Sequence, residues 1–375
     1  MEKGNVIILD GGMGHELKRR GISDDGTFVA GALANEKYST SDIVENIHMD
    51  YLAAGCDVIT TNSFVAVSIF KTSTSSIDAL NMLLNCITLR NEKSQVPRRM
   101  IECGLATTDA DSKQRASQLI IAAVARARAA IAKHNENFPE DKRKKLVAGC
   151  VPPLTECYFS CKVPLSVDCL IPEYRVILST LLECNVDILL AETLSTTREA
   201  HAILRSLHYI HQTGKNCIPP LWMSFTVHDD QPSKLRSDEP LDLVCQSILH
   251  EATVLNLPLK AVGVNCSTPS AISQAVPILS KLVEGSDIKV CAYGNCFKTT
   301  TSEWIKTLND NACTAVLRTD VEICAKDYDE EVLTSDAYSN FACEWARLGV
   351  SIIGGCCGSR PRHMSSVATA LKDFG

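Results

Sequence analysis

Residues 352–358 read Ile-Ile-Gly-Gly-Cys-Cys-Gly, a short apolar run that stops on two adjacent cysteines between glycines. A second apolar run, in residues 261–267, also stops at a cysteine, Cys266, and Ser267 follows it. Adjacent cysteines make a poor disulfide because their Cα atoms lie about 3.8 Å apart, below the usual disulfide window. Both thiols can face one metal ion if the backbone turns sharply, and flanking glycines permit that turn.

Apolar runs of this kind recur along the chain and alternate with helix-like segments. They are continuous rather than alternating in polarity, which is typical of parallel strands buried on both faces. The pattern predicts an α/β fold, a (β/α)8 TIM barrel, with residues 1–375 forming a single domain. The expected strands span residues 6–10, 57–61, 146–150, 186–192, 221–227, 260–266, 289–295 and 350–356, and the expected helices span residues 41–54, 114–135, 172–184, 197–212, 241–255, 270–282 and 335–348.

Two long stretches interrupt this rhythm. Residues 72–112 follow the second expected strand, and residues 298–334 follow the seventh. Catalytic loops and lids of barrels sit at the C-terminal ends of strands, which is where both stretches begin. We therefore expect enlarged loops after strands 2 and 7, and the sequence leaves open whether they act as lids.

The composition indicates a soluble, mildly acidic protein. Of the 375 residues 45% are hydrophobic, enough for a full core. Lys and Arg number 37 against 44 Asp and Glu, so the net charge is −7, which argues against nucleic acid as a partner. No stretch reaches the roughly 18 apolar residues of a membrane span. Eighteen cysteines without a signal peptide favour a reducing, cytoplasmic compartment.

Unusual polar residues stand where the expected strands end. Because the C-terminal ends of barrel strands converge on one face, residues far apart in the sequence are expected to line one pocket there. These residues are Asp10, Asn62, Glu192, Cys266, Asn295, Cys356 and Cys357.

The three cysteines of this set predict a zinc site with one open position, as catalytic zinc sites keep. A substrate thiol that took the open position would ionise, because the metal lowers its pKa. The alternatives are ordinary packing of buried cysteines and a structural zinc closed by a fourth protein ligand. Two competing ligand sets, Cys157 with Cys161 and His208 with His211, lack a strand end with a glycine turn, so packing or surface roles are favoured for them.

The carboxylates of the set suit an ammonium group. Asp10 precedes Gly11 and Gly12, but the GxGxxG spacing of a dinucleotide site is absent, so these glycines are expected to let a ligand approach the backbone. The alternative role for Asp10 is a helix N-cap. Glu192 closes a strongly apolar strand, where a carboxylate is costly unless it is paired with a substrate ammonium or an internal salt bridge.

Together these motifs resemble the homocysteine S-methyltransferase family. The resemblance implies that Cys266, Cys356 and Cys357 hold Zn²⁺ and that Asp10 and Glu192 hold the amino group of homocysteine. It further implies that the 61–64 loop lies near the substrate carboxylate; we count Gly11, Asn62, Ser63 and Asn265 among the expected substrate contacts. The motifs are Leu9–Gly14, Thr61–Phe64, Ala191–Thr193, Gly263–Cys266, Tyr293–Asn295 and Gly354–Gly358.

The activity that this resemblance implies is methyl transfer to the thiol of L-homocysteine, giving methionine. The expected donor is a sulfonium, S-methylmethionine or S-adenosylmethionine. We favour S-methylmethionine because the glycine-rich turn is not the adenosine-binding signature of a Rossmann-type methyltransferase. The sequence leaves open a betaine- or selenocysteine-type thiol methyltransferase, a non-catalytic zinc-binding barrel, and the choice between monomer and homo-oligomer.

Overall fold

The computed structural model describes residues 6–22, 42–64, 109–154, 158, 160, 163–164, 166–214, 217–297, 328–329 and 332–372. Most of the two expected long loops lies outside these ranges. Cys157 and Cys161 also lie outside them.

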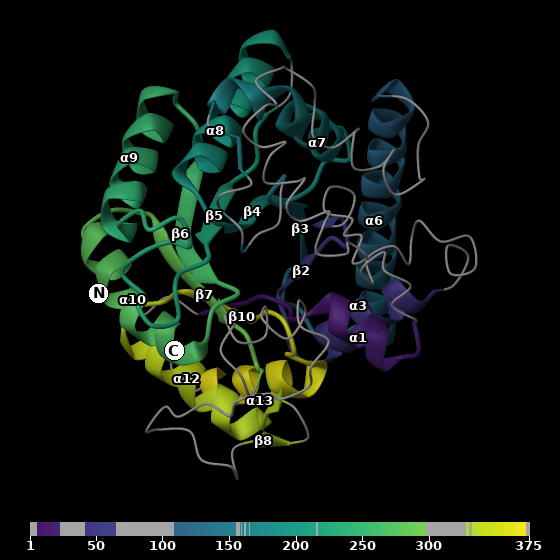
Figure 1. Ribbon diagram of the computed structural model, residues 1–375. Helices are drawn as coiled ribbons and strands as arrows, with labels where there is room; N and C mark the ends of the chain where they lie inside the picture. The colour runs from purple at the N-terminus through teal and green to yellow at the C-terminus, as the bar shows by residue number, and fades with distance from the viewer. Residues whose placement is uncertain are drawn as a thin grey trace, which may run out of the picture.

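Eight parallel strands form one sheet that curls into a barrel, with helices around it (Figure 1). The neighbours run in the order β1-β10-β7-β6-β5-β4-β3-β2. Hydrogen bonds from Asp57 N to Ile8 O (2.8 Å) and from Asp10 N to Val58 O (3.0 Å) link β1 to β2 and close the ring. The (β/α)8 prediction is therefore confirmed. The strands are β1 (Ile7–Ile8), β2 (Val58–Thr60), β3 (Leu146–Val151), β4 (Ile188–Leu194), β5 (Leu221–Phe225), β6 (Leu259–Asn265), β7 (Lys289–Gly294) and β10 (Ile352–Gly355).

Helices cover the outside of the barrel, and each of the seven expected ones is present. The structure adds two helices that the sequence pattern did not predict, α1 and α13, and a small antiparallel pair, β8 (Tyr328–Asp329) with β9 (Val332–Leu333). The helices are α1 (Met13–Arg19), α3 (Ile43–Ala53), α6 (Asp109–Asn137), α7 (Ile171–Glu183), α8 (Thr197–Thr213), α9 (Leu241–Val254), α10 (Pro269–Leu282), α12 (Ser335–Arg347), α13 (Pro361–Leu371) and the short 3-10 helix η4 (Val167–Cys169).

Local sequence signals set where these helices begin and end. Thr196, Thr268 and Thr334 cap α8, α10 and α12, each accepting a hydrogen bond from a backbone N–H of the first turn. After α7 and α12 the chain turns through left-handed residues, Asn185 (φ 53°) and Gly349 (φ 96°). A left-handed residue at this position ends a helix and redirects the chain into the next strand.

The core has two parts, as expected for a barrel. One fills the inside of the ring and contains Leu190, Trp222 and Tyr293. The other lies between the strands and the surrounding helices and contains Tyr51, Tyr174 and many aliphatic side chains. Because the ring is packed with side chains rather than open, a site can form only at its ends.

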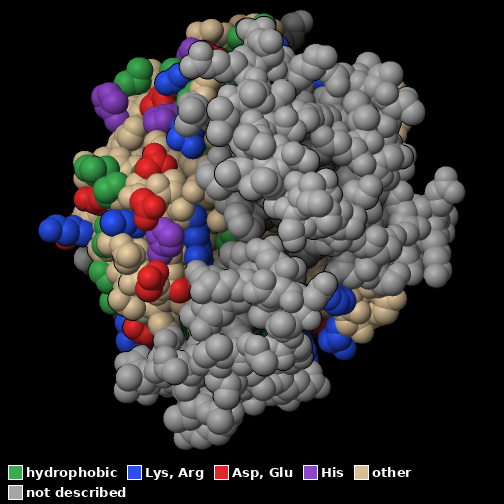
Figure 2. Space-filling view, viewed as in Figure 1, with side chains coloured by type: hydrophobic (Ala, Val, Ile, Leu, Met, Phe, Trp, Pro, Cys, Tyr) green, Lys and Arg blue, Asp and Glu red, His purple; other side chains and the backbone are tan. Residues whose placement is uncertain are grey.

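On the face seen in Figure 2, the charged side chains of the described residues are of both signs. Over α9 and α10, acidic and basic side chains are interspersed on the face seen in Figure 2, and no continuous basic patch stands out among the residues described there. Within the described ranges, no helix is long and apolar enough to cross a membrane.

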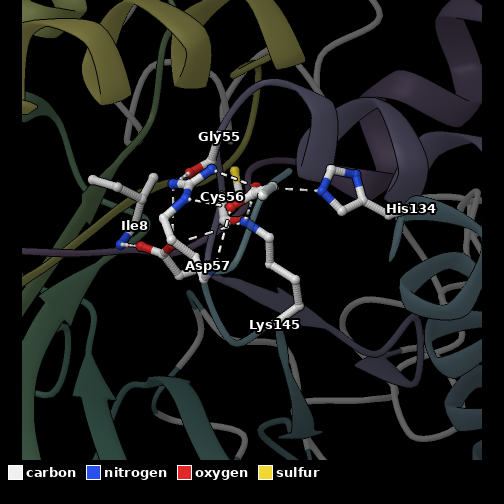
Figure 3. A network of polar contacts seen from close by, with 8 residues as sticks. Ile8, Gly55, Cys56, Asp57, His134 and Lys145 are labelled. Atoms are coloured by element: carbon white, nitrogen blue, oxygen red, sulfur yellow. Dashed lines mark hydrogen bonds and ion pairs between the residues drawn. The ribbon is translucent and has the colours of Figure 1, made fainter. Parts of the chain in front are cut away.

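A buried charge network closes the N-terminal end of the barrel, away from the strand ends that carry the site (Figure 3). The Lys145 ammonium donates to Cys56 O (3.0 Å) and pairs with Asp141 (3.0 Å). Asp57 accepts from Ile8 N (3.0 Å), which fastens the start of β2 to β1. The Lys145 side chain is fully buried, so the network satisfies a charge that would otherwise be costly.

We predict that Lys145→Met lowers the free energy of unfolding by about 2 kcal/mol, because it leaves the buried carbonyl of Cys56 without its donor and removes one of the two cations that Asp141 pairs with, Arg143 being the other. Chemical denaturation followed by circular dichroism measures this. Lys142→Met, at an exposed neighbouring position, is the matched control and should change stability by less than about 0.5 kcal/mol. Equal stabilities of the two variants would show that the Lys145 network adds nothing to the fold.

Candidate metal centre and substrate site

Three cysteine thiols meet at the C-terminal end of the barrel. Cys266 directly follows β6, and Cys356 and Cys357 directly follow β10. Their Sγ atoms all lie within 4.8 Å of one another, and those of Cys266 and Cys357 are 3.7 Å apart. Two sulfurs bound tetrahedrally to one ion at about 2.3 Å would be about 3.8 Å apart. The spacing therefore fits a single thiophilic metal ion, as the sequence predicts.

The backbone around these cysteines is held by the strand between them. Cys266 N donates to Tyr293 O (3.1 Å), Cys356 N donates to Gly294 O (2.9 Å), and Cys357 O accepts from Cys296 N (2.8 Å). Cys266 has a left-handed conformation, with φ 51°. A non-glycine residue in that region costs roughly 1–3 kcal/mol and persists only where its surroundings hold it, which is typical of functional sites.

The turn after β1 that contains Gly11 and Gly12 (the glycine turn) packs against the turn after β10 that contains Cys356 and Cys357 (the cysteine turn). A Cβ added at Gly11 would lie 2.6 Å from Ser359 Oγ, and one at Gly12 would lie 2.6 Å from Cys356 O. Gly12 N donates to Ser359 Oγ (3.0 Å), which in turn donates to Cys356 O (2.7 Å). At the positions that a Cβ would occupy, Gly11 and Gly12 therefore make room for protein atoms. The expected substrate contact at Gly11 stays a prediction.

Asn265, the last residue of β6, has all its hydrogen-bonding positions filled by protein. Its Oδ1 accepts from Thr193 N (2.9 Å) and Ser224 Oγ (2.8 Å). Its amide group donates to Thr193 Oγ1 (2.8 Å) and to Cys356 Sγ (3.9 Å). A side-chain amide has two donors and two acceptor sites, so none remains for another partner. Asn265 therefore contacts a candidate metal ligand directly and ties β4, β5 and β6 together behind it.

The thiols share protons unequally. Hydrogen bonds from the Cys356 and Cys357 thiols hold the pKa of Cys266 well below its usual range, and the nearby Arg236 charge adds to this. The same hydrogen bonds raise the pKa of Cys356. Tyr158 lies against the cluster, its hydroxyl 2.8 Å from Cys266 Sγ. One thiolate is therefore already favoured before a metal ion adds its own charge.

Glu192 lies inside β4, two residues before the strand ends. Our prediction that Glu192 is the last residue of this strand was therefore wrong by two residues. The β4–β5 register is irregular just after it, where Thr193 adopts φ 59°. Its Oε1 accepts from the Cys150 thiol (3.1 Å). Burial raises the pKa of Glu192 to about 7, although the hydrogen bond from Cys150 and the nearby Tyr293 hydroxyl lower it. Among the described residues no Lys, Arg or His forms a salt bridge with this carboxylate, so the internal salt bridge that we considered for Glu192 is absent there.

Asp10 follows β1 and is 3% exposed. Its two carboxylate oxygens accept from Thr60 N and Thr60 Oγ1, both at 2.8 Å. Burial, with a smaller contribution from the charge of Glu192, raises the pKa of Asp10 to about 8 despite these bonds. The two carboxylates therefore interact within one buried region, as the barrel topology predicts.

The end of β2 supplies neutral polar groups to the same face. Asn62 is 7% exposed, and its Nδ2 has no hydrogen-bond partner among the described protein groups. Ser63 Oγ lies 2.8 Å from Thr61 Oγ1 and donates to Cys150 O (3.3 Å). A buried amide donor without a partner is costly, and an acceptor atom of a ligand that bound to Asn62 Nδ2 would remove that cost.

Several residues of this site were missed by the sequence analysis. Cys150 and Ser359 offered no motif of their own, since their roles depend on contacts between strands. Tyr158 lies between the two cysteines considered as a rival ligand set, and Arg236 lies in the segment after β5 with its guanidinium 5.7 Å from the Tyr158 ring centroid. The other rival, His208, lies on α8 and is hydrogen-bonded to Gln212.

Comparison with known proteins gives one family over nearly the whole chain. Residues 7–371 match the family model described as homocysteine S-methyltransferase. The chain is 24% identical to homocysteine S-methyltransferase 4 of Zea mays over 375 residues, covering 99% of this chain and 91% of that protein. It is 25% identical to a homocysteine S-methyltransferase of Bacillus subtilis (strain 168), covering 98% and 95%.

A selenocysteine Se-methyltransferase of Brassica oleracea var. italica is 23% identical and covers 99% of this chain and 90% of that protein. Among solved structures, the metallated form of the homocysteine methyltransferase MmuM from Escherichia coli aligns with a TM-score of 0.67 at 19% identity, covering 98% of this chain and 97% of that one. This structural likeness supports the barrel fold.

We predict that Asn265→Ala weakens metal binding by about 10- to 100-fold, because it removes the side chain that orients Cys356. Competition with a chromogenic chelator, with Zn²⁺ as the probe ion, measures the affinity. Ser224→Ala is the matched control: it removes one donor to Asn265 but keeps the contact with Cys356, so its affinity should fall less than about threefold. An Asn265→Ala affinity equal to that of the unchanged protein would contradict the orienting role.

Proposed function

Because the chain belongs to the homocysteine S-methyltransferase family, we propose that it moves a methyl group from a sulfonium donor to the thiol of L-homocysteine, giving methionine. The observation that carries the proposal is the convergence of three thiols at the strand ends, within 4.8 Å of one another. The reaction would serve methionine biosynthesis. The cytoplasmic location expected from the sequence stays a prediction.

Zn²⁺ is the proposed cofactor, held by Cys266, Cys356 and Cys357. Soft thiolate ligands select zinc among the common divalent ions, and a set of three leaves one tetrahedral position for a substrate. When bound, zinc supplies the Lewis acidity that lowers the pKa of a coordinated thiol. The depressed pKa of Cys266 favours such a site, because at least one ligand is readily ionised.

The amino-acid part of the acceptor is proposed to bind beside this centre. Asp10 and Glu192 are buried carboxylates with raised pKa values, so a cation that paired with them would relieve the cost of their charge. The ammonium group of homocysteine supplies that cation. The unpartnered Nδ2 of Asn62 suits the carboxylate of the same substrate, and Ser63 stands next to it.

The chemistry then needs alignment more than acid–base help. A bond forms between the homocysteine sulfur and the methyl carbon while the donor C–S bond breaks, and its electron pair stays on the donor sulfur. The thiol proton passes to solvent, and the sulfonium becomes a neutral thioether. Since this leaving group is neutral, it needs no protonation, and holding the acceptor sulfur in line supplies much of the rate.

The proposed donor is S-methylmethionine, with S-adenosylmethionine as the second choice. We favour the smaller donor because the glycine-rich turn after β1 is not the adenosine-binding signature of a Rossmann-type methyltransferase. A selenol acceptor is the alternative that the relatives raise, since one of them is named selenocysteine Se-methyltransferase.

We predict that zinc-loaded protein forms two methionines for each homocysteine consumed with S-methylmethionine, and that a strong chelator abolishes this. Amino-acid analysis by chromatography measures the stoichiometry. Turnover only with S-adenosylmethionine, betaine or a selenol acceptor would keep the family but change the substrate.

Cys357→Ser should lose zinc and activity while its circular dichroism stays native. Normal turnover and full zinc content in Cys357→Ser would refute the ligand assignment.

We predict that Glu192→Gln raises the KM for homocysteine roughly tenfold or more, because the neutral amide cannot pair with an ammonium group. The KM for the sulfonium donor should change less than about twofold. Steady-state kinetics with each substrate varied in turn measures both. Glu183→Gln, at an exposed position ending α7, is the control and should leave both constants unchanged. An unchanged KM for homocysteine in Glu192→Gln would remove Glu192 from the acceptor site.

A further inference from the structure

Cys150 is a buried thiol at the mouth of the barrel that neither the metal cluster nor the proposed chemistry uses. It is the next-to-last residue of β3 and is fully buried. Its Sγ donates to Glu192 Oε1 at 3.1 Å, across the β3–β4 pair. Burial, and then the charge of Glu192, raise the pKa of the Cys150 thiol well above its usual value, so it keeps the proton that it donates.

The backbone of Cys150 is tied to the end of β2 by a closed ring of hydrogen bonds. Cys150 N donates to Thr61 Oγ1 (2.9 Å), and Ser63 Oγ donates to Cys150 O (3.3 Å). The two hydroxyls lie 2.8 Å apart, so Thr61 is left to donate to Ser63. Each hydroxyl then donates once and accepts once, which satisfies every member of a buried network.

The two sets of contacts make Cys150 the link between two parts of the acceptor site. Its thiol reaches the carboxylate that is proposed to hold the ammonium group. Its backbone holds the segment that carries Asn62 and Ser63, which is proposed to face the substrate carboxylate. The distance between the groups that receive the two ends of an amino acid therefore depends on Cys150.

We propose that Cys150 is a positioning residue for the acceptor amino acid and that it acts through Glu192. This inference rests on the proposed function. A thiol is a weak donor, so it orients the carboxylate while leaving most of its acceptor strength for a cation. An apolar side chain at this position would leave the Glu192 carboxylate without the donor that orients its Oε1. A cysteine also fits a fully buried strand position, as a small hydrophobic side chain.

The test compares Cys150→Ala with Cys150→Ser in full-length, zinc-loaded protein. Alanine removes the donor, whereas serine keeps one at nearly the same volume. We expect Cys150→Ala to raise the KM for homocysteine about fivefold or more, with zinc content and donor KM unchanged. Cys150→Ser should lie within about twofold of the unchanged protein. Cys245→Ala, at a buried cysteine on α9, is the control and should leave the homocysteine KM unchanged.

A double variant tests whether Cys150 acts through Glu192. In a Glu192→Gln background, Cys150→Ala should change the homocysteine KM less than about twofold, because the group it positions is already altered. Should Cys150→Ala fail to fold by circular dichroism, Cys150→Val takes its place, because it also removes the thiol donor while filling the buried position, and it should raise the same KM.

Equal KM values for the alanine and serine variants would overturn the proposal, because packing alone would then explain Cys150. Loss of zinc in Cys150→Ala would overturn it too, since the residue would then belong to the metal site. Isothermal titration of L-homocysteine distinguishes a failure of the proposed function from a failure of the positioning role. An unchanged protein that binds L-homocysteine without transferring methyl groups would refute the proposed function, whereas weaker binding only in Cys150→Ala would still support the positioning role.

Discussion

The site depends on one electrostatic constraint: the mouth of the barrel concentrates acidic groups where water cannot easily stabilise their charge. Three thiols crowd within 4.8 Å, and two carboxylates, Asp10 and Glu192, are buried with raised pKa values. Such a cluster is costly unless cations balance it. In the proposed function a metal ion balances the thiolates and a substrate ammonium balances the carboxylates. In that account, binding of the metal ion and of the ammonium group is favourable because each relieves the cost of a buried negative charge.

The two ends of the barrel differ in whether their charged groups are paired within the protein. At the N-terminal end, Lys145 and its aspartates satisfy their own charges and fasten β1, β2 and β3 together. At the C-terminal end, rigidity comes from close backbone packing and from neutral side chains. Ser359 locks the glycine turn onto the cysteine turn, and Asn265 joins three strands behind Cys356. The reactive groups are thus held in place by partners that do not neutralise them.

Much of this was predictable from sequence because parallel strands leave a strong local signal. Each of the eight apolar runs became a strand, and Cys266 and Cys356 stand directly after β6 and β10. The contacts between strands were not predictable in the same way. Nothing in a single sequence indicates that Gly12 accommodates Cys356, that Asn265 is fully bonded within the protein, or that Cys150 reaches Glu192. Helices α1 and α13 were not predicted because neither leads directly into one of the apolar runs.

X-ray absorption at the zinc edge tests the central claim most directly, because it counts the sulfur atoms around the metal ion. The account predicts three sulfur neighbours at about 2.3 Å and one lighter atom in the zinc-loaded protein. Adding L-homocysteine should replace the lighter atom with a fourth sulfur, and Cys357→Ser should abolish the signal of bound zinc. A four-ligand protein site that does not change on adding homocysteine would contradict the account and favour a structural metal ion.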